Sequence, residues 1–100
     1  LVEEFTVPAN LALLDADKLQ GQLTLRRWRE GDWFIPFGMT GKKKLSDYLI
    51  DRKLSLPAKQ RQFVLLSGGE IVWGVGERID ERFRLDDKSE NVLCITREIV

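Results

Sequence analysis

The sequence predicts a small single domain of the α+β class, with about six strands and one or two short helices. Short apolar or β-branched runs recur along the chain, separated by turn-forming residues. Residues 43–53 have the clearest spacing of an amphipathic helix. The length of 100 residues suits one domain, so residues 1–100 are treated as a single unit.

The first quarter of the chain is predicted to contain short extended runs, with a turn at residues 15–17. Phe5 and Val7 alternate with polar residues until Pro8 ends the run. Residues 11–14 form a short apolar run that is typical of a buried strand. Leu23 and Leu25 alternate with the polar Thr24 and Arg26, which predicts another strand that ends near Trp28.

The segment 43–53 is predicted to be an amphipathic helix. At about 100° per residue, its apolar face consists of Leu45, Tyr48 and Leu49. Lys43 and Asp47 lie on the opposite face, at the i,i+4 spacing of an ion pair. Pro57 suits the first turn of a second, shorter helix.

Two apolar runs, at 63–66 and 71–75, predict a β-hairpin. The intervening residues 67–70 read Ser-Gly-Gly-Glu, and glycine readily adopts the positive φ that tight hairpin turns require. Residues 82–85 are predicted to form another short strand. The β-branched residues within 92–99 predict a closing strand.

The composition excludes several classes of function. Apolar residues make up 43% and charged residues 32%, as in ordinary soluble domains. No histidine is present, which excludes Ser-His-Asp and Cys-His catalysis and His-ligated metal sites. The lone Cys94 excludes an internal disulfide and fits the cytoplasm. The start at Leu1, without a signal-peptide pattern, suggests a domain excised from a longer enzyme or a processed chain.

The net charge is zero, but the charges are unevenly distributed along the chain. Between Arg26 and Arg61 there are ten cations and four anions, a net charge of +6. The other 64 residues hold six cations and twelve anions, a net charge of −6. The central segment therefore suits an anionic partner, provided that the fold gathers its cations on one surface.

Three adjacent lysines, Lys42 to Lys44, stand at the entrance of the predicted helix. A helix N-terminus favours anions, so cations there conflict with the helix dipole unless an anionic partner binds. A nucleic-acid phosphate is one interpretation, and a solvated run of charges is the other. The neighbouring aromatic residues Trp28, Trp33 and Phe34 suit stacking on unpaired bases or, equally, a place in the core. Trp73 is expected in the core.

Several segments resemble catalytic motifs but lack essential residues. Residues 67–69 match the start of an SGGxDS pyrophosphate loop, but no Asp-Ser pair and no helix pattern follow, so a hairpin turn is favoured. Residues 74–76 and 41–42 likewise fail as dinucleotide and Walker A motifs. The acidic pairs at 80–81 and 86–87 are expected on the solvated surface. We therefore predict neither a catalytic residue nor a metal ligand.

The order of residues in LRRWREGDWFIPFGMTGKKKLSDYLIDRK, followed by Arg61 and GGEIVWGVGERIDERFR, resembles the C-terminal domain of tRNA(Ile)-lysidine synthetases. The resemblance covers about residues 23–85. The matching positions are Arg27, Gly31, Asp32, Pro36, Gly38, Met39, Lys42, Lys43, Leu45, Asp47, Leu49, Ile50, Lys53, Arg61, Ile71, Trp73, Gly76, Arg78, Ile79 and Asp80. The chain departs from the family pattern in two places. Pro57 follows Lys53 later than the family's proline would, and Gln62-Phe63 stands where the family often has a proline.

The resemblance implies the role of the parent enzyme. The family uses ATP, with Mg, in an N-terminal catalytic domain to adenylate the wobble cytidine of a minor isoleucine tRNA and then attach lysine. The present domain would be non-catalytic and free of cofactors, and would contact the tRNA toward its acceptor stem. Its fold would be similar to a module of the phenylalanyl-tRNA synthetase β subunit, and its location cytoplasmic.

The expected partners are the isoleucine tRNA and the N-terminal catalytic domain of the same chain, with no membrane. The candidate tRNA-binding residues are all basic: Arg27, Arg29, Lys42, Lys43, Lys44, Lys53, Arg61 and Arg78. The alternative is a protein-interaction or dimerisation module that docks through a basic face, and a homodimer is left open.

Overall fold

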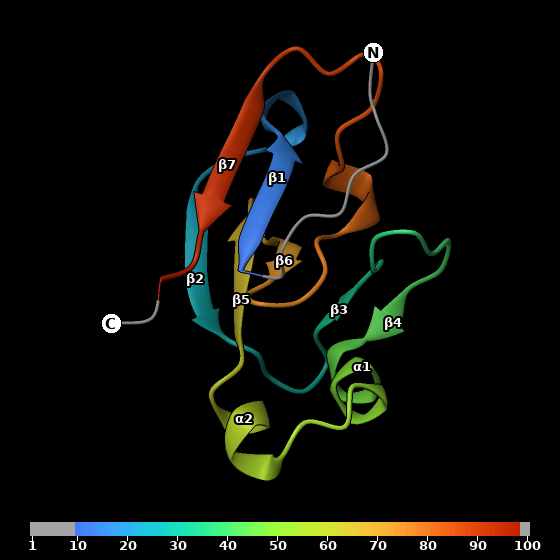
Figure 1. Cartoon of the computed structure of the whole chain (residues 1–100), viewed down its shortest axis with the longest axis vertical. Helices are drawn as coiled ribbons and strands as arrows, with labels where there is room; N and C mark the ends of the chain where they lie inside the picture. The colour runs from blue at the N-terminus through green and yellow to red at the C-terminus, as the bar shows by residue number, and fades with distance from the viewer. Residues whose placement is uncertain (1–9, 99–100) are drawn as a thin grey trace.

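The computed structural model describes residues 10–98 and contains, within them, an α+β fold of short elements (Figure 1). The strands are β1 (Leu11–Asp15), β2 (Leu23–Arg27), β3 (Trp33–Phe34), β4 (Lys43–Lys44), β5 (Phe63–Ser67), β6 (Glu70–Gly74) and β7 (Val92–Thr96). The helices are α1 (Leu45–Asp51) and α2 (Leu56–Gln60), with 3-10 turns η1 (Ala16–Lys18) and η2 (Glu81–Phe83). The predicted fold class is confirmed, and residues 10–98 contain one strand more than the approximate number predicted.

The strands pair in three antiparallel groups, which are β2-β5-β6, β1-β7 and β3-β4. The predicted hairpin is confirmed as β5–β6, where Ser67 pairs with Glu70. Gly68 and Gly69 close its turn with φ values of 57° and 89°. The central sheet therefore depends on a turn whose backbone suits glycine.

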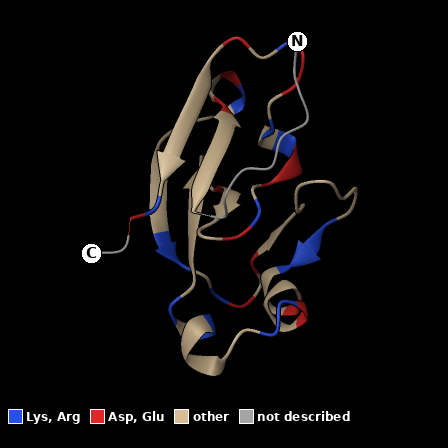
Figure 2. Ribbon diagram, in the orientation of Figure 1, with Lys and Arg blue, Asp and Glu red and all other residues tan. Residues whose placement is uncertain are grey.

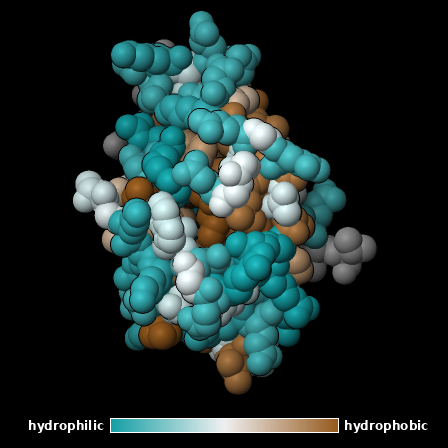
Figure 3. All heavy atoms as spheres, turned by 180° about the vertical axis from the view of Figure 1, so that it is seen from behind, coloured by the Kyte–Doolittle hydropathy of each residue, from teal (hydrophilic) through white to brown (hydrophobic). Residues whose placement is uncertain are grey.

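The core lies on both faces of the central sheet, because adjacent strand residues point in opposite directions. Val64 and Leu66 pack with α1 and with Phe34 of β3. Leu65, between them, packs with Trp73 and with residues of β1. Figure 1 shows the β1–β7 pair in front of the sheet and α1 beside the β3–β4 pair. Seen from behind, apolar side chains reach the surface near the middle of the molecule, and hydrophilic ones cover most of the rest (Figure 3).

The helix begins two residues later than predicted, and this moves the lysines. Lys43 and Lys44 form β4, because their backbone pairs with Phe34 and Trp33. The first helical N–H, that of Leu45, donates to the carbonyl of Asp32 at 2.9 Å. The prediction of a helix over 43–53 is therefore wrong at its start, since pairing with a strand ten residues upstream outweighs local periodicity. Its end is also earlier than predicted, at Asp51.

Two other predictions of local structure are corrected. Residues 82–85 do not form a strand, because the Asp80 carboxylate accepts the Arg82 N–H and caps the 3-10 turn η2. The closing strand ends at Thr96 rather than at residue 99. The strand-like run around Phe5 and Val7 lies outside the described residues. Within the described range, no helix is both long and apolar enough to span a bilayer.

Candidate nucleic-acid interface

The β3–β4 pair sorts the three lysines onto two faces. Lys44 is opposite Trp33 and Lys43 is opposite Phe34 in the strand register. Phe34 is fully buried, so Lys43 lies on the inward side, where it is half-buried and pairs with Asp51. The predicted pairing of Lys43 with Asp47 is therefore wrong.

Lys42 and Lys44 lie on the opposite face of this pair, because strand residues two apart point the same way. Both lysines are exposed. The Lys42 ammonium stands 4.2 Å from the centroid of the Trp33 ring. The lysine run thus provides two outward cations, and its central member is occupied by an ion pair.

Trp33 acts as a support for cations. Arg82 also lies over its ring, with the guanidinium carbon 4.8 Å from the centroid. Such contacts are favourable because the face of an aromatic ring is electronegative. Of the aromatic residues whose place the sequence left open, Phe34 is in the core, whereas Trp28 and Trp33 are half-buried. The prediction of Trp73 in the core is confirmed.

Asp80 fixes the start of the loop between β3 and β4. Its side chain has no exposed surface and accepts the N–H of Ile35 at 2.8 Å and that of Arg82 at 2.8 Å. The Arg82 guanidinium also donates to both carboxylate oxygens, at 2.9 and 3.0 Å. The hydrogen bond to Asp80 is the main cause that raises the pKa of Arg82 above its ordinary value. The expectation of a solvated pair at 80–81 is therefore wrong.

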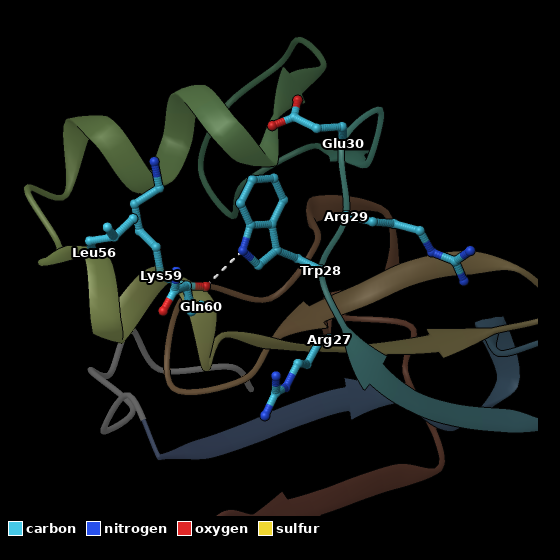
Figure 4. A pocket seen from close by; sticks show the side chains of 7 residues that line it. All are labelled: Arg27, Trp28, Arg29, Glu30, Leu56, Lys59 and Gln60. Atoms are coloured by element: carbon cyan, nitrogen blue, oxygen red, sulfur yellow. Dashed lines mark hydrogen bonds between the residues drawn. The ribbon is translucent and has the colours of Figure 1, made fainter.

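A second basic group surrounds an open cavity of about 450 Å³ (Figure 4). Its lining residues are Arg27, Trp28, Arg29, Glu30, Leu56, Lys59 and Gln60. The indole N–H of Trp28 donates to the carbonyl of Lys59 at 2.8 Å, which holds the ring between β2 and α2. Figure 4 shows the side chains of Arg27 and Arg29 leaving the chain in different directions, on either side of Trp28. The cavity therefore has a fixed aromatic wall and a mainly cationic rim.

The turn at residues 29–32 joins the two basic groups. Arg26 donates to both oxygens of Asp32, at 2.9 and 3.0 Å, and the Arg29 N–H donates to the same carboxylate at 2.8 Å. Burial alone would raise the pKa of Asp32, but the hydrogen bonds from Arg26 and Arg29 outweigh it and lower the pKa below its usual value. The backbone carbonyl of Asp32 also accepts the N–H of Leu45, the first residue of α1. The cavity and β4 therefore adjoin the same turn.

The structure gathers the candidates into two groups and leaves two at the ends of helices. Lys42, Lys44 and Arg78 belong to the β3–β4 loop region, and Arg27 and Arg29 belong to the cavity. Lys53 and Arg61 follow α1 and α2, respectively. All of these are exposed, and among residues 10–98 only Lys43 of the eight candidates forms an ion pair.

Basic side chains therefore concentrate in the half of the molecule that contains β4, the end of β2 and α2 (Figure 2). Two other cations of the basic segment, Arg26 and Arg52, are engaged by Asp32 and Glu77. The candidate set omitted Lys59, which lines the cavity. Lys59 belongs to the short helix α2, and nothing in the sequence indicates that this helix lies beside the cavity.

Comparison with known proteins identifies the family. The family model described as the TilS substrate C-terminal domain matches residues 23–95. The chain belongs to this family. The family membership that was predicted from residues 23–85 is thereby confirmed. The two basic groups described above therefore lie on a TilS C-terminal domain.

Curated relatives of this TilS domain are called tRNA(Ile)-lysidine synthase. One from Parabacteroides distasonis is 55% identical over 94 residues, and one from Bacteroides thetaiotaomicron is 52% identical over 92 residues. These alignments cover 92% and 90% of the chain but only 22% of each relative. The chain therefore spans about a fifth of their length.

A crystal structure of a TilS C-terminal domain has the same fold. The superposition covers 99% of this chain and 79% of that chain, with a TM-score of 0.75 and 18% sequence identity. At this identity the likeness establishes the fold alone.

Proposed function

We propose that this chain is the tRNA-contacting C-terminal domain of a tRNA(Ile)-lysidine synthase in the cytoplasm. Family membership and the name shared by its relatives support this proposal. The ligase chemistry, with ATP and Mg, would belong to an N-terminal catalytic domain of the same protein, which attaches lysine to the wobble cytidine of a minor isoleucine tRNA. This domain would position the tRNA through its acceptor stem. A similarity to the phenylalanyl-tRNA synthetase β module is part of the same proposal.

The observation that carries the proposal is the set of exposed cations around the β3–β4 pair and the cavity. Exposed Lys and Arg side chains bind phosphate and release counterions, which provides affinity without reading sequence. Seven of the eight candidates are exposed: Arg27, Arg29, Lys42, Lys44, Lys53, Arg61 and Arg78. Lys43 remains a candidate, but any phosphate must compete with Asp51 for it.

The lysines act through their side chains in this proposal, without help from a helix N-terminus. Lys43 and Lys44 precede α1 in a strand, and the Leu45 N–H is already bound to Asp32. The conflict between three cations and the helix dipole is therefore much reduced. A contact between these lysines and phosphate needs only the outward position of Lys44 on β4 and of Lys42 just before it.

A protein-interaction or dimerisation module is the second candidate, and β2 favours it. Among residues 10–98 this strand pairs with β5 alone, and it exposes Leu23 and Leu25, which are 41% and 59% accessible. An uncovered strand edge with apolar side chains is a common place for pairing with another chain. A protein partner docked on this edge would account for the exposed Leu23 and Leu25. RNA would account for the exposed cation at the end of the same strand, Arg27.

Salt dependence of tRNA binding distinguishes the two functions. If about four exposed cations contact phosphate, the slope of log affinity against log salt should be roughly −3 to −4. The measurement is fluorescence anisotropy of a labelled isoleucine tRNA transcript with this chain at several salt concentrations. Sedimentation of the chain alone tests the second function. A shallow slope with a stable dimer would contradict tRNA binding as the main role.

We expect this chain alone to carry out no lysine transfer. The proposed catalytic machinery lies in another domain, so the chain should not release pyrophosphate from ATP with lysine and tRNA present. Lysine incorporation into tRNA is the measurement, with a complete synthase as positive control. Transfer by this chain would contradict the proposed division of labour.

A further inference from the structure

The loop between β3 and β4 exposes two large apolar side chains on one tight turn. The Met39 N–H donates to the carbonyl of Pro36 at 2.9 Å, and Gly38 has a φ of 89°. A glycine with positive φ at the third position is the pattern of a type II turn. Phe37 and Met39 are 50% and 39% accessible. Neither side chain is needed to fill the two core clusters.

This turn is anchored at several points. The Phe37 N–H donates to the carbonyl of Ile79, and the Gly38 N–H donates to the Glu81 carboxylate, each at 2.9 Å. Just before the turn, Ile35 donates to Asp80 and accepts from the Glu81 N–H. Phe37 and Met39 are therefore presented in a fixed place. A binding surface that is fixed in advance loses less entropy when a ligand binds.

Cations lie beside the same turn. A guanidinium nitrogen of Arg78 is 3.5 Å from the carbonyl oxygen of Phe37. Lys42 follows in the same loop, and its ammonium is held over Trp33. An aromatic side chain next to backbone-binding cations is the arrangement by which proteins hold single-stranded nucleic acid. Figure 1 shows that this loop projects from the body of the molecule, where a ligand can approach.

We propose that Phe37 and Met39 form a stacking platform for an unpaired nucleotide of the bound RNA, with Arg78 and Lys42 against its phosphates. The proposal rests on the proposed tRNA binding and adds a contact that depends on an unpaired base. The base stacks on the Phe37 ring and packs against the Met39 thioether. Every base has a face that can stack, so the platform selects unpaired over paired nucleotides and does not select sequence.

The test compares two RNA hairpins of the same duplex sequence, one blunt and one with a four-nucleotide 3′ overhang. The unmodified chain should bind the overhang hairpin at least about fivefold more tightly, the lower end of the range for one stacked base. The Phe37→Ala/Met39→Ala variant should lose this preference and keep its affinity for the blunt hairpin. Its salt slope should not change, because no cation is removed.

Three further variants separate stacking from other roles. Phe37→Trp should keep the preference for the overhang, whereas Phe37→Leu should lose most of it, because only an aromatic ring stacks. Val92→Ala removes apolar surface of similar exposure, 54%, from β7, away from the loop, and should change nothing. Thermal melts of each variant verify that the fold is retained.

The outcomes distinguish the platform from the function on which it rests. Equal affinity of the unmodified chain for both hairpins, or an unchanged preference in the double variant, would overturn the platform but leave phosphate binding intact. Failure of the chain to bind either hairpin would contradict the proposed function as well. A double variant that binds both RNAs normally but loses self-association would assign the turn to a protein partner and overturn the platform.

Discussion

At the scale of single residues, Asp80 determines the shape of the loop that carries the candidate contacts. It is buried without exposed surface and accepts hydrogen bonds from the backbone of Ile35 and from Arg82. A buried carboxylate is tolerated only when such partners replace water. Asp80 thereby fixes the start of the β3–β4 loop and holds Arg82 against the face of the Trp33 ring.

Replacement of Asp80 should destabilise the domain strongly. Asp80→Ala leaves Arg82 and the Ile35 N–H without their partner, and removal of one member of a buried pair is much more harmful than loss of a surface pair. Because Arg82 is partly exposed and can reach water, we expect a loss of about 2–4 kcal/mol. Urea denaturation measures it. Asp87→Ala, an exposed acidic control, should change stability by less than about 0.5 kcal/mol.

Asp86 should make the stability depend on acid pH. Hydrogen bonds from the Lys18 ammonium and the Lys88 N–H lower the pKa of Asp86 from 3.8 to about 2. A lowered pKa in the folded state stabilises the fold above the unfolded value, and this contribution is lost as pH falls from about 4 to about 2. Asp86→Asn should therefore show a smaller loss of stability over this window. Denaturant midpoints at pH 5, 4, 3 and 2 test this, and parallel curves for both proteins would contradict it.

At the scale of elements, the β5–β6 turn shows why an apparent phosphate loop is structural. The Ser67 hydroxyl is buried, donates to the Gln20 carbonyl at 2.7 Å and accepts the Gln20 N–H at 2.8 Å. Gly68 then passes directly against the same Gln20 carbonyl. The Ser-Gly-Gly sequence is therefore needed because the β5–β6 turn packs closely against the backbone at Gln20.

Alanine at the two turn glycines should have unequal effects. A Cβ on Gly68 would lie 2.5 Å from the Gln20 carbonyl oxygen, whereas one on Gly69 would meet nothing within 4 Å. Both residues have positive φ, so Gly69→Ala should lose about 1–2 kcal/mol from strain alone. Gly68→Ala adds overlap and should lose about 3 kcal/mol or more. Equal losses in thermal melts would mean that the approach to Gln20 relaxes freely.

The comparison of elements also shows what sequence could predict. The β5–β6 hairpin and the apolar face of α1 follow from local turn chemistry and periodicity, and both were predicted. The start of α1 was not, because β4 exists only through pairing with β3. The turn η2 was missed for a different reason, which is that the burial of its capping residue is visible only in the fold. Its cap, Asp80, is an ordinary acidic residue in sequence and a buried anchor only in the fold.

At the scale of the whole molecule, the uneven charge of the sequence becomes an uneven surface. The basic segment forms the half that contains β4, the end of β2 and α2 (Figure 2). The sequence showed an excess of cations between Arg26 and Arg61 but left open whether the fold gathers them, and the ordered family pattern predicted the fold. It could not separate the outward Lys42 and Lys44 from the inward Lys43, because that separation depends on the register of β4. It also could not place Lys59 at the cavity.

The outward lysines provide the most direct test of the central claim, which is that this surface binds tRNA phosphates. Lys42→Gln/Lys44→Gln removes two exposed cations, whereas Lys43→Gln removes one that is paired with Asp51. The measurement is the slope of log affinity for tRNA against log salt, with thermal melts as the control of folding. The double variant should have a slope shallower by about 1.4 to 1.8 units, and Lys43→Gln should have a slope close to that of the unmodified chain. An unchanged slope in a folded double variant would contradict the claim and leave these lysines as solvated surface.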